Sequence, residues 1–354
     1  MTRTIQEEKS TAKLDPSTAC LEEFIDPAAE IAAIHAQRLR AIETVDQDLV
    51  LVSQVQRSGG TLVTQMFDGH PELHVHPTEL YIGRPNKWDW PRLDLDGRPE
   101  DWFAALFEPY TNRGLREGYS KQPLKRRSET ERYECLMLPS LMRAIFLELA
   151  SARSPKSQRE ILNWHMTAYF NGWLGYPLSG SRRRLVFAFV PRLISNAESV
   201  AGYFDDYPGG RLISLVRDPV SWYASAHALN SVTYPDPVSA AEHWIASTNG
   251  MLREKEQRAD RVRLVKFEQL IERPEHEARR LCEFLEIGFD PIVLTPTYMG
   301  RPIAASSSFR LDGHGVLKDP ADRRRQVSEK DTAAIVALTS ALYADAVEAV
   351  ESQD

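Results

Sequence analysis

The stretch from Asp48 to Pro77 constrains the fold of this chain more than any other. An apolar run, LVLVSQV, is followed by QRSGGT and then by a second apolar run that ends in DGHP. A β-branched apolar run of this length is typical of a buried central strand. Gly59 and Gly60 lack a Cβ atom, so the backbone can turn tightly and its N–H groups can approach an anion. The stretch therefore predicts a phosphate-binding loop between a strand and a helix.

The residues after the glycines strengthen this interpretation. The spacing of Leu62 and Met66 predicts a short helix that begins at Thr61, and its N-terminal amides and dipole would face the same anion. A nucleotide-hydrolysing P-loop would carry a lysine after its last glycine. Here the cation is Arg57, which precedes the glycines. A Gly-Gly turn without any ligand is the alternative interpretation.

A second motif lies between Arg211 and Ser225, RLISLVRDPVSWYAS. Its apolar residues predict a buried strand, and Asp218 is a good N-cap for a helix that follows directly. Arg217 therefore stands at the exit of the strand. Ser221 and Ser225 are four residues apart and share one face of the predicted helix. A guanidinium and a hydroxyl placed in this way could hold one phosphate together.

These two motifs resemble those of the sulfotransferases that use 3′-phosphoadenosine 5′-phosphosulfate (PAPS). In that family an Arg/Lys-Ser-Gly-Thr-Thr loop binds the 5′-phosphosulfate, and an arginine followed eight residues later by a serine binds the 3′-phosphate. Gly60 departs from the pattern, since the family has threonine there. The resemblance implies that eight residues bind the donor: Arg57, Ser58, Gly59, Gly60, Thr61 and Leu62 at one end, and Arg217 and Ser225 at the other.

A third stretch, from Val262 to Ile287, resembles the strand, loop and helix that follow the second motif in this family. Its own pattern predicts a strand from Val262 to Phe267 and an amphipathic helix opened by Pro274. Glu268 is interpreted as a structural hydrogen-bonding acid. Together the three stretches run from Leu49 to Pro291.

The order of the predicted elements indicates an α/β fold. Strands alternate with helices, including a strand at 185–190, so we expect a central parallel sheet flanked by helices. The resemblance implies the P-loop NTPase-like sulfotransferase fold. We expect an N-terminal helical segment at 1–47 and a single domain at 48–354. That domain would contain a substrate-binding helical insert at about 79–184 and a C-terminal helical tail.

The resemblance also implies a reaction, the in-line transfer of a sulfuryl group from PAPS to a hydroxyl or amine acceptor, which releases 3′-phosphoadenosine 5′-phosphate (PAP). Negative charge would grow on the leaving phosphate, and Arg57 is predicted to stabilise it. No metal is required if the loop amides already provide donors. Phe189-Val190-Pro191 stands where many members have Lys-Thr-Pro, so that lysine is missing and Arg192 is a possible substitute.

Glu79, in HPTEL, is predicted to be the general base, since some family members use a glutamate just after the first helix. A surface loop acid is the alternative. His165 is the next candidate for the base, although a packed histidine is the simpler interpretation. His70, His74 and His76 lie close together in a stretch read as an extended loop, and their spacing does not favour a metal site. Trp88 and Trp90 could stack on an acceptor or pack a lid.

Composition limits the remaining possibilities. The net charge of −7 argues against general nucleic-acid binding. No apolar run approaches the ~18 residues that span a bilayer, so we expect no membrane span. Three widely spaced cysteines and the polar N-terminus lead us to expect a cytoplasmic protein. Lys318 and Arg323 to Arg325 are candidates to cover the 3′-phosphate. We expect a small molecule or a carbohydrate as the acceptor. The sequence does not indicate which one, and it does not indicate the oligomeric state.

Two alternatives to a sulfotransferase stay open. One is a P-loop nucleotide or small-molecule kinase, which the missing GK[ST] pattern disfavours. The other is a non-catalytic relative that binds PAP, which Gly60 and the missing lysine would favour.

Overall fold

The computed structural model describes residues 25–82, 86, 88–108, 136–178, 182–303, 315–316 and 323–353, and the side chains of Arg323 and Arg325 are outside that description. The chain divides into two compact units, residues 1–42 and 43–354. The first contains helix α2, Pro27–Leu39, which Asp26 caps by accepting hydrogen bonds from the amides of Ala28 and Ala29. A helix is therefore present within the segment at 1–47 that the sequence predicts to be helical, and it ends at Leu39.

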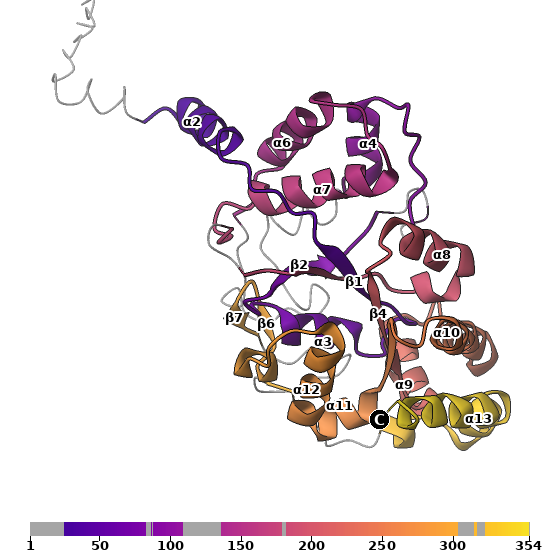
Figure 1. The fold of residues 1–354 in the computed structure, drawn as a ribbon. Helices are drawn as coiled ribbons and strands as arrows, with labels where there is room; N and C mark the ends of the chain where they lie inside the picture. Colours follow the sequence, from indigo (N-terminus) through magenta and orange to yellow (C-terminus); the bar gives the residue numbers. More distant parts are fainter. Residues whose placement is uncertain are drawn as a thin grey trace, which may run out of the picture. The chain divides into compact units, whose positions relative to one another are not determined.

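The second unit is built on a five-stranded parallel sheet, which confirms the predicted α/β class (Figure 1). Its strands lie in the order β2-β3-β1-β4-β5. In chain order they are β1 (Asp48–Val52), β2 (Leu73–Glu79), β3 (Leu185–Phe189), β4 (Arg211–Val216) and β5 (Val262–Lys266). The central strand, β1, pairs in parallel with β3 on one side and β4 on the other. Its residues Leu49 to Val52 are at most 1% exposed, as expected for a strand covered on both faces.

Helices cover both faces of the sheet (Figure 1). One face holds α3 (Gly60–Phe67), α11 (Phe267–Glu272) and α12 (Pro274–Leu285), and the other holds α8 (Ala197–Asp206), α9 (Pro219–Leu229), α10 (Pro237–Gln257) and α13 (Glu329–Glu351). Met66 and Leu281 belong to the core cluster under the first group. Trp222, Trp244 and Ile335 belong to a second cluster between α9, α10 and α13. The short elements are η2 (Leu193–Ser195), η3 (Pro291–Leu294), β6 (Thr297–Tyr298), β7 (Arg301–Pro302) and η4 (Arg323–Gln326).

A helical layer lies beside the edge strand β2 (Figure 1). It consists of α4 (Pro99–Leu106), α6 (Pro139–Ser151) and α7 (Gln158–Gly172), which pack on one another. Aromatic contacts join α7 to β2. The ring of Phe170 lies 4.9 Å from that of His74, and the ring of Tyr169 lies 4.5 Å from that of His76. The predicted helical insert is therefore placed next to the end of β2.

The sequence interpretation of residues 70–79 as a loop was wrong for most of that range, because Leu73–Glu79 forms β2. This strand contains Pro77, which cannot donate a ladder hydrogen bond, and an edge strand is where a sheet tolerates it. The pairing of β2 with β3 shifts register between Val75 and Glu79. Such irregularities turn the following side chain in a new direction. A smaller correction applies to β5, which ends at Lys266 because Phe267 already begins α11.

Helix α13 forms the C-terminal tail. Ser328 caps it by accepting a hydrogen bond from the amide of Asp331 at 3.0 Å. Among the described helices, α13 is long and apolar enough to cross a membrane, and 22% of its most apolar window is buried. A few polar residues interrupt the apolar sequence of this helix, so it contains no uninterrupted apolar run. The expectation of no membrane span therefore stays a prediction.

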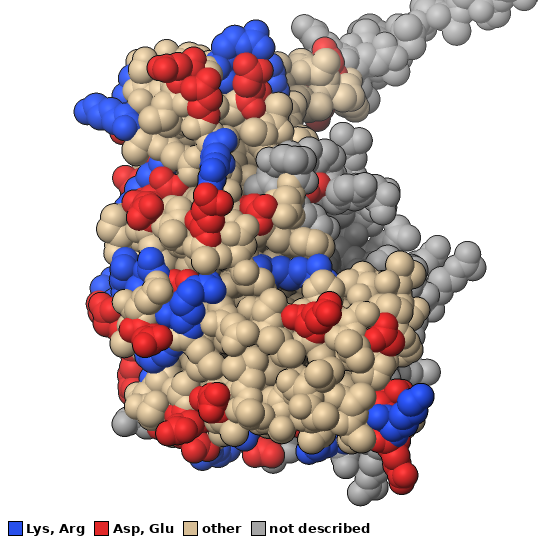
Figure 2. Space-filling model, turned by 90° about the vertical axis from the view of Figure 1, so that its right-hand side faces the viewer, with Lys and Arg blue, Asp and Glu red and all other residues tan. Residues whose placement is uncertain are grey.

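Charged side chains of both signs are intermingled on the face that Figure 2 shows. This view looks from the right-hand side of Figure 1, where α8 and α10 lie. The net charge of −7 is thus not gathered into one patch on the described part of this face.

Candidate active site

The carboxyl ends of the five parallel strands meet at one edge of the sheet, and the polar residues singled out by the sequence follow these ends. In open α/β sheets this edge is where ligands bind. Glu79 ends β2, Arg192 follows β3, Arg57 follows β1, Arg217 follows β4, and Glu268 follows β5. The fold therefore collects side chains that are far apart in the sequence.

The loop after β1 has the backbone geometry of an anion-binding turn. Gly59 has φ 103° and precedes α3 without offering a side-chain cap, so the first amides of the helix are not capped by it. Arg57 also lies in the left-handed region, with φ 72°. The Oγ of Ser58 is buried and has no hydrogen-bond partner among the described residues. A buried orphan hydroxyl of this kind calls for a ligand or solvent partner.

Both glycines of the loop are also required by packing. A Cβ atom on Gly59 would lie 2.6 Å from the ring of Phe267. On Gly60 it would lie 2.2 Å from Nε2 of Gln54 and 2.4 Å from the ring of Phe189. The side chain that the resemblance leads one to expect at position 60, threonine, has no room because these two side chains occupy its space.

Arg217 joins the two phosphate motifs. Its Nη1 donates to the backbone oxygen of Arg57 at 2.6 Å, across 160 residues of sequence. Its Nη2 donates to Oγ of Ser225 at 3.1 Å, and the guanidinium lies 4.5 Å over the ring of Phe267. Arg217 is 9% exposed, so it is held from several sides. The loop, the second motif and the start of α11 therefore meet at one point.

Glu79 lies within electrostatic range of Arg57. Burial lowers the pKa of Arg57, while the charges of Glu79 and Tyr234 raise it. An arginine stays protonated at neutral pH under such shifts. The hydroxyl of Tyr81 donates to Oε2 of Glu79. Glu79 and Arg57 therefore interact electrostatically although they follow different strands.

Arg192 follows β3, which lies between the strands that end at Glu79 and at the Arg57 loop. It adopts φ 67° just after β3, and its Nη2 donates to the hydroxyl of Tyr234 at 2.8 Å. Tyr234 in turn donates to Oε1 of Gln56 at 3.2 Å. The guanidinium of Arg192 stacks 4.5 Å over the ring of Trp88. The cation considered as a substitute for the missing lysine is thus connected to the phosphate loop.

A hydrogen bond joins the second motif to the start of α11. Asp218 caps α9 by accepting from the amide of Ser221 at 2.8 Å. The backbone N–H of Asp218 donates to Oε1 of Glu268 at 3.0 Å, so Glu268 has the structural role that the sequence predicts. Burial raises the pKa of Glu268, opposed by these hydrogen bonds. Arg324 lies 3.6 Å from the carboxylate of Asp218. Lys318 and the side chains of Arg323 and Arg325 lie outside the described residues.

A family model described as the sulfotransferase family matches residues 50–291 of the chain, which include both phosphate motifs. The chain belongs to the sulfotransferase family. This confirms the resemblance drawn from the residues. A sequence search among curated proteins gives no match.

Solved structures of other sulfotransferases are similar to this chain. The sulfotransferase domain from the Synechococcus PCC 7002 olefin synthase is 21% identical, with a TM-score of 0.47, over 88% of this chain and 95% of that one. The sulfotransferase domain from the curacin biosynthetic pathway is 17% identical, with a TM-score of 0.44, over 84% and 99%. Retinol dehydratase, solved with androsterone and inactive cofactor PAP, is 11% identical, with a TM-score of 0.35, over 88% and 85%.

The histidines of this sulfotransferase occupy defined places around β2. Nε2 of His70 lies 2.9 Å from the backbone oxygen of Gly288, Nδ1 of His74 lies 3.1 Å from the hydroxyl of Tyr176, and Nδ1 of His76 lies 2.8 Å from the backbone oxygen of Thr78. Their ring nitrogens therefore point to different partners and do not converge on one metal. His165 is buried in α7, as a packed histidine would be.

The tryptophans considered for stacking have different surroundings. Trp88 contacts Arg192. Trp90 is buried, and its Nε1 donates to Asp206 at 2.7 Å. Trp90 therefore packs the fold, whereas Trp88 borders the site.

Four residues of the site escaped the sequence analysis: Gln54, Gln56, Tyr81 and Tyr234. The two glutamines had a local signal, because polar side chains directly after an apolar strand are unusual unless they serve a site. Tyr81 follows Glu79 by two residues, but nothing in the sequence indicates that their side chains meet. Tyr234 is brought in by the turn between α9 and α10.

Proposed function

We propose that this protein transfers a sulfuryl group from PAPS to an acceptor hydroxyl or amine and releases PAP. The observation that carries this proposal is the position of Arg217, which binds the loop carbonyl of Arg57 with one Nη atom and Ser225 with the other. A single ligand with phosphate groups at two positions would contact both motifs. Family membership supports sulfuryl transfer in general.

The residues of the loop fit the phosphosulfate end of such a donor. Gly59 and Gly60 let the backbone turn tightly against Phe267, Gln54 and Phe189, and the buried Oγ of Ser58 needs a partner. Thr61 and Leu62, in the first turn of α3, would add backbone amides. Arg57 would supply the charge.

The fit of the 3′-phosphate rests on Arg217 and Ser225. The two side chains are already hydrogen-bonded to each other, so a phosphate would meet a preformed pair, and the Ser225 hydroxyl, which donates to the backbone oxygen of Ser221 at 3.2 Å, would turn its hydrogen to the phosphate. The Phe267 ring, which the Arg217 guanidinium contacts, fixes the orientation of the guanidinium plane. A preorganised donor pair loses little side-chain freedom when it binds.

The chemistry assigned to this site is an in-line displacement. A bond forms between the acceptor oxygen and sulfur, the bond between sulfur and the bridging oxygen of the phosphate breaks, and PAP leaves with that electron pair. Arg57 stabilises the charge that develops on the leaving oxygen. The carboxylate of Glu79 takes the proton of the acceptor. Tyr81 donates to Glu79 and orients it.

Transfer of a radiolabelled sulfuryl group from PAPS to a panel of acceptors tests the proposal. The protein should label an acceptor at the same rate with and without a metal chelator, since neither Arg57 nor Glu79 works through a metal. Transfer of a phosphoryl group from ATP that stops when the chelator is added, without transfer from PAPS, would indicate the kinase alternative. PAP binding without any transfer across the panel would indicate the non-catalytic relative.

Glu79→Gln tests the assigned base. Transfer should fall by about 10²-fold or more, because a positioned base contributes 10²–10⁴-fold, while the affinity for PAP should change little. Glu72→Gln is a matched control, since Glu72 lies just before the opposite end of β2. If turnover survives in Glu79→Gln, the base is another residue, and His165→Gln is the next variant to assay.

A further inference from the structure

The side chain of Gln54 is a buried polar group that the protein leaves unpaired. Gln54 follows β1 and is 0% exposed. Neither Oε1 nor Nε2 of its carboxamide has a hydrogen-bond partner among the described residues. Folded proteins pair the large majority of their buried polar atoms, so each exception calls for an explanation. Two unpaired atoms in one side chain point to a partner that this part of the chain does not supply.

Hydrogen bonds fix the backbone around this side chain. The backbone oxygen of Gln54 accepts from the N–H of Arg192, after β3, at 3.0 Å. The N–H of the next residue, Val55, donates to Oγ of Ser247 in α10 at 2.8 Å. The backbone is therefore held from two sides, whereas the carboxamide at the end of the side chain is not held by any hydrogen bond among the described residues.

The carboxamide of Gln54 reaches the N-terminus of α3. A Cβ atom on Gly60, the first residue of α3, would overlap Nε2 of Gln54. The amide therefore occupies the space in which a side chain at position 60 would begin. The first N–H groups of α3 and the buried Oγ of Ser58 belong to the proposed phosphosulfate site. The N–H₂ group of Gln54 adds two hydrogen-bond donors at the same place.

A second buried glutamine, Gln65, shows that an unpaired carboxamide alone is not sufficient for this role. It is 2% exposed, and both polar atoms of its side chain lack a partner among the described residues. Gln65 lies in the second half of α3, however, toward the end where the helix dipole disfavours an anion. Of the two glutamines, Gln54 is the one placed at the anion-binding end.

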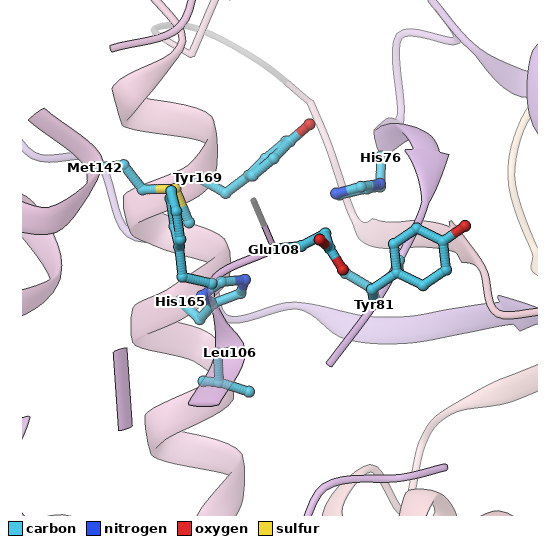
Figure 3. Close-up of a pocket in the computed structure, with 9 residues that line it drawn as sticks. His76, Tyr81, Leu106, Glu108, Met142, His165 and Tyr169 are labelled. Carbon is cyan, nitrogen blue, oxygen red and sulfur yellow. The ribbon is translucent and has the colours of Figure 1, made fainter. Parts of the chain in front are cut away.

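A water-sized space accounts for another unpaired atom near the site, Nδ1 of His165. His165 lines a small pocket together with His76 and Tyr169, as Figure 3 shows. Leu106 of α4 and Met142 of α6 also line it. The pocket has room for about one water molecule, which could pair with Nδ1. It is too small for an organic ligand, so His165 does not indicate a second binding site.

We propose that Gln54 binds the 5′-phosphate of the sulfuryl donor, with an N–H of its carboxamide donating to a phosphate oxygen. The proposal rests on the proposed function, because it adds a residue to the donor site of that function. Since PAPS and PAP both carry the 5′-phosphate, Gln54 contacts the donor before transfer and the leaving group after it. The carboxamide is buried, and a hydrogen bond is stronger in such a place than in water.

The stability of Gln54→Met without ligand separates this role from a structural one. Methionine has nearly the shape of glutamine and lacks its N–H groups. Because the carboxamide is unpaired in the free protein, the urea midpoint of Gln54→Met should equal or exceed that of the wild type. A lower midpoint would show that the carboxamide stabilises the fold through a partner of its own, and this result would overturn the proposal.

Three nucleotides test the contact with the 5′-phosphate: PAP, adenosine 5′-phosphate and adenosine 3′-phosphate. Each is titrated calorimetrically into the full chain. Gln54→Met should bind PAP and adenosine 5′-phosphate about tenfold or more weakly than the wild type, because each loses a hydrogen bond to a charged group. The affinity for adenosine 3′-phosphate, which lacks the 5′-phosphate, should hardly change.

Gln65→Met is the matched control, because it replaces a similarly buried and unpaired glutamine of α3. It should alter none of the three affinities. Wild-type affinities of Gln54→Met for PAP and adenosine 5′-phosphate would overturn the proposal. So would an equal loss for adenosine 3′-phosphate, because a general disturbance of the loop would then explain the result.

Gln54→Leu keeps the test valid if Gln54→Met does not fold, since leucine also lacks donors and should give the same pattern of affinities. The test also distinguishes this proposal from the proposed function. If the wild type binds PAP and the Gln54 variants bind it equally well, the role of Gln54 falls and the proposed function stands. If the wild type does not bind PAP, both fall.

Discussion

At the residue scale, the site depends on side chains whose roles are visible only when their neighbours are known. Arg57, Ser58 and Arg217 could be singled out from the sequence because each stands where an apolar strand ends. The sequence did not indicate that Arg217 binds the backbone of Arg57. Nor did it indicate why Gly60 replaces the threonine of the family, since the cause is the packing of Gln54 and Phe189.

Gly60→Ala should destabilise the protein. The new Cβ atom would overlap Gln54 and Phe189, and overpacking a filled site costs about 1–3 kcal/mol. Urea unfolding measures the change in the free energy of unfolding. Gly175→Ala is the control, because a Cβ atom at Gly175 meets nothing within 4 Å. Equal stabilities of the two variants would contradict the packing described for the loop.

The buried histidines predict a loss of stability in acid. The pKa of an unfolded histidine is ~6.5, and burial lowers that of His165 to about 3 and that of His76 to about 4. Below pH ~6.5 the unfolded chain binds more protons than the folded one, so the free energy of unfolding falls as the pH falls toward these values.

The measurement compares urea unfolding at pH 7 and pH 5 for the wild type and His165→Phe. Without one buried histidine the fall between pH 7 and pH 5 should be smaller by about 2 kcal/mol, because the unfolded histidine becomes protonated within this range. Identical pH dependence in wild type and His165→Phe would contradict the burial of this ring.

At the scale of elements, the junctions between strands and helices carry the function. The sequence predicted the helices after β1 and β4 well, because glycine in one case and Asp218 with proline in the other mark their starts. It missed β2, where two histidines and Pro77 obscure the apolar pattern. Only the position of β2 at the edge of the sheet makes such a strand acceptable.

Helix α13 gives a prediction at this scale, because its apolar composition can be explained by packing or by a membrane. In the structure Ile335 is 2% exposed and lies in the core with Trp222 and Trp244, whereas Leu338 is 46% exposed. Ile335→Ala should therefore lower the free energy of unfolding in urea by about 2–4 kcal/mol. Leu338→Ala should change it by less than about 0.5 kcal/mol. Equal effects would show that this helix does not pack in solution as described.

At the scale of the whole molecule, the order of the strands in the parallel sheet determines which loops lie together at the candidate site. The sequence predicted the α/β class and the parallel sheet from alternating patterns. It could not give the strand order β2-β3-β1-β4-β5, which places Glu79 and Arg57 at one edge although β3 separates their strands. The pocket between α4, α6, α7 and the end of β2 was beyond reach for the same reason, because these elements line it without any shared local signal.

The central claim is that one ligand bearing two phosphate groups spans the loop after β1 and the start of α9. Calorimetric titration of PAP, and of adenosine 5′-phosphate as the analogue without the 3′-phosphate, tests this claim in the wild type and in Arg217→Ala. Arg211→Ala, at the opposite end of the same strand, is the control and should alter neither affinity.

A charge-assisted hydrogen bond contributes about 1.5–3 kcal/mol, so Arg217→Ala should weaken PAP binding roughly tenfold to a hundredfold. The affinity for adenosine 5′-phosphate should fall less, and only because Arg217 also holds the loop through the carbonyl of Arg57. Unchanged binding of PAP, or an equal loss for both ligands, would contradict the assignment of the 3′-phosphate to Arg217.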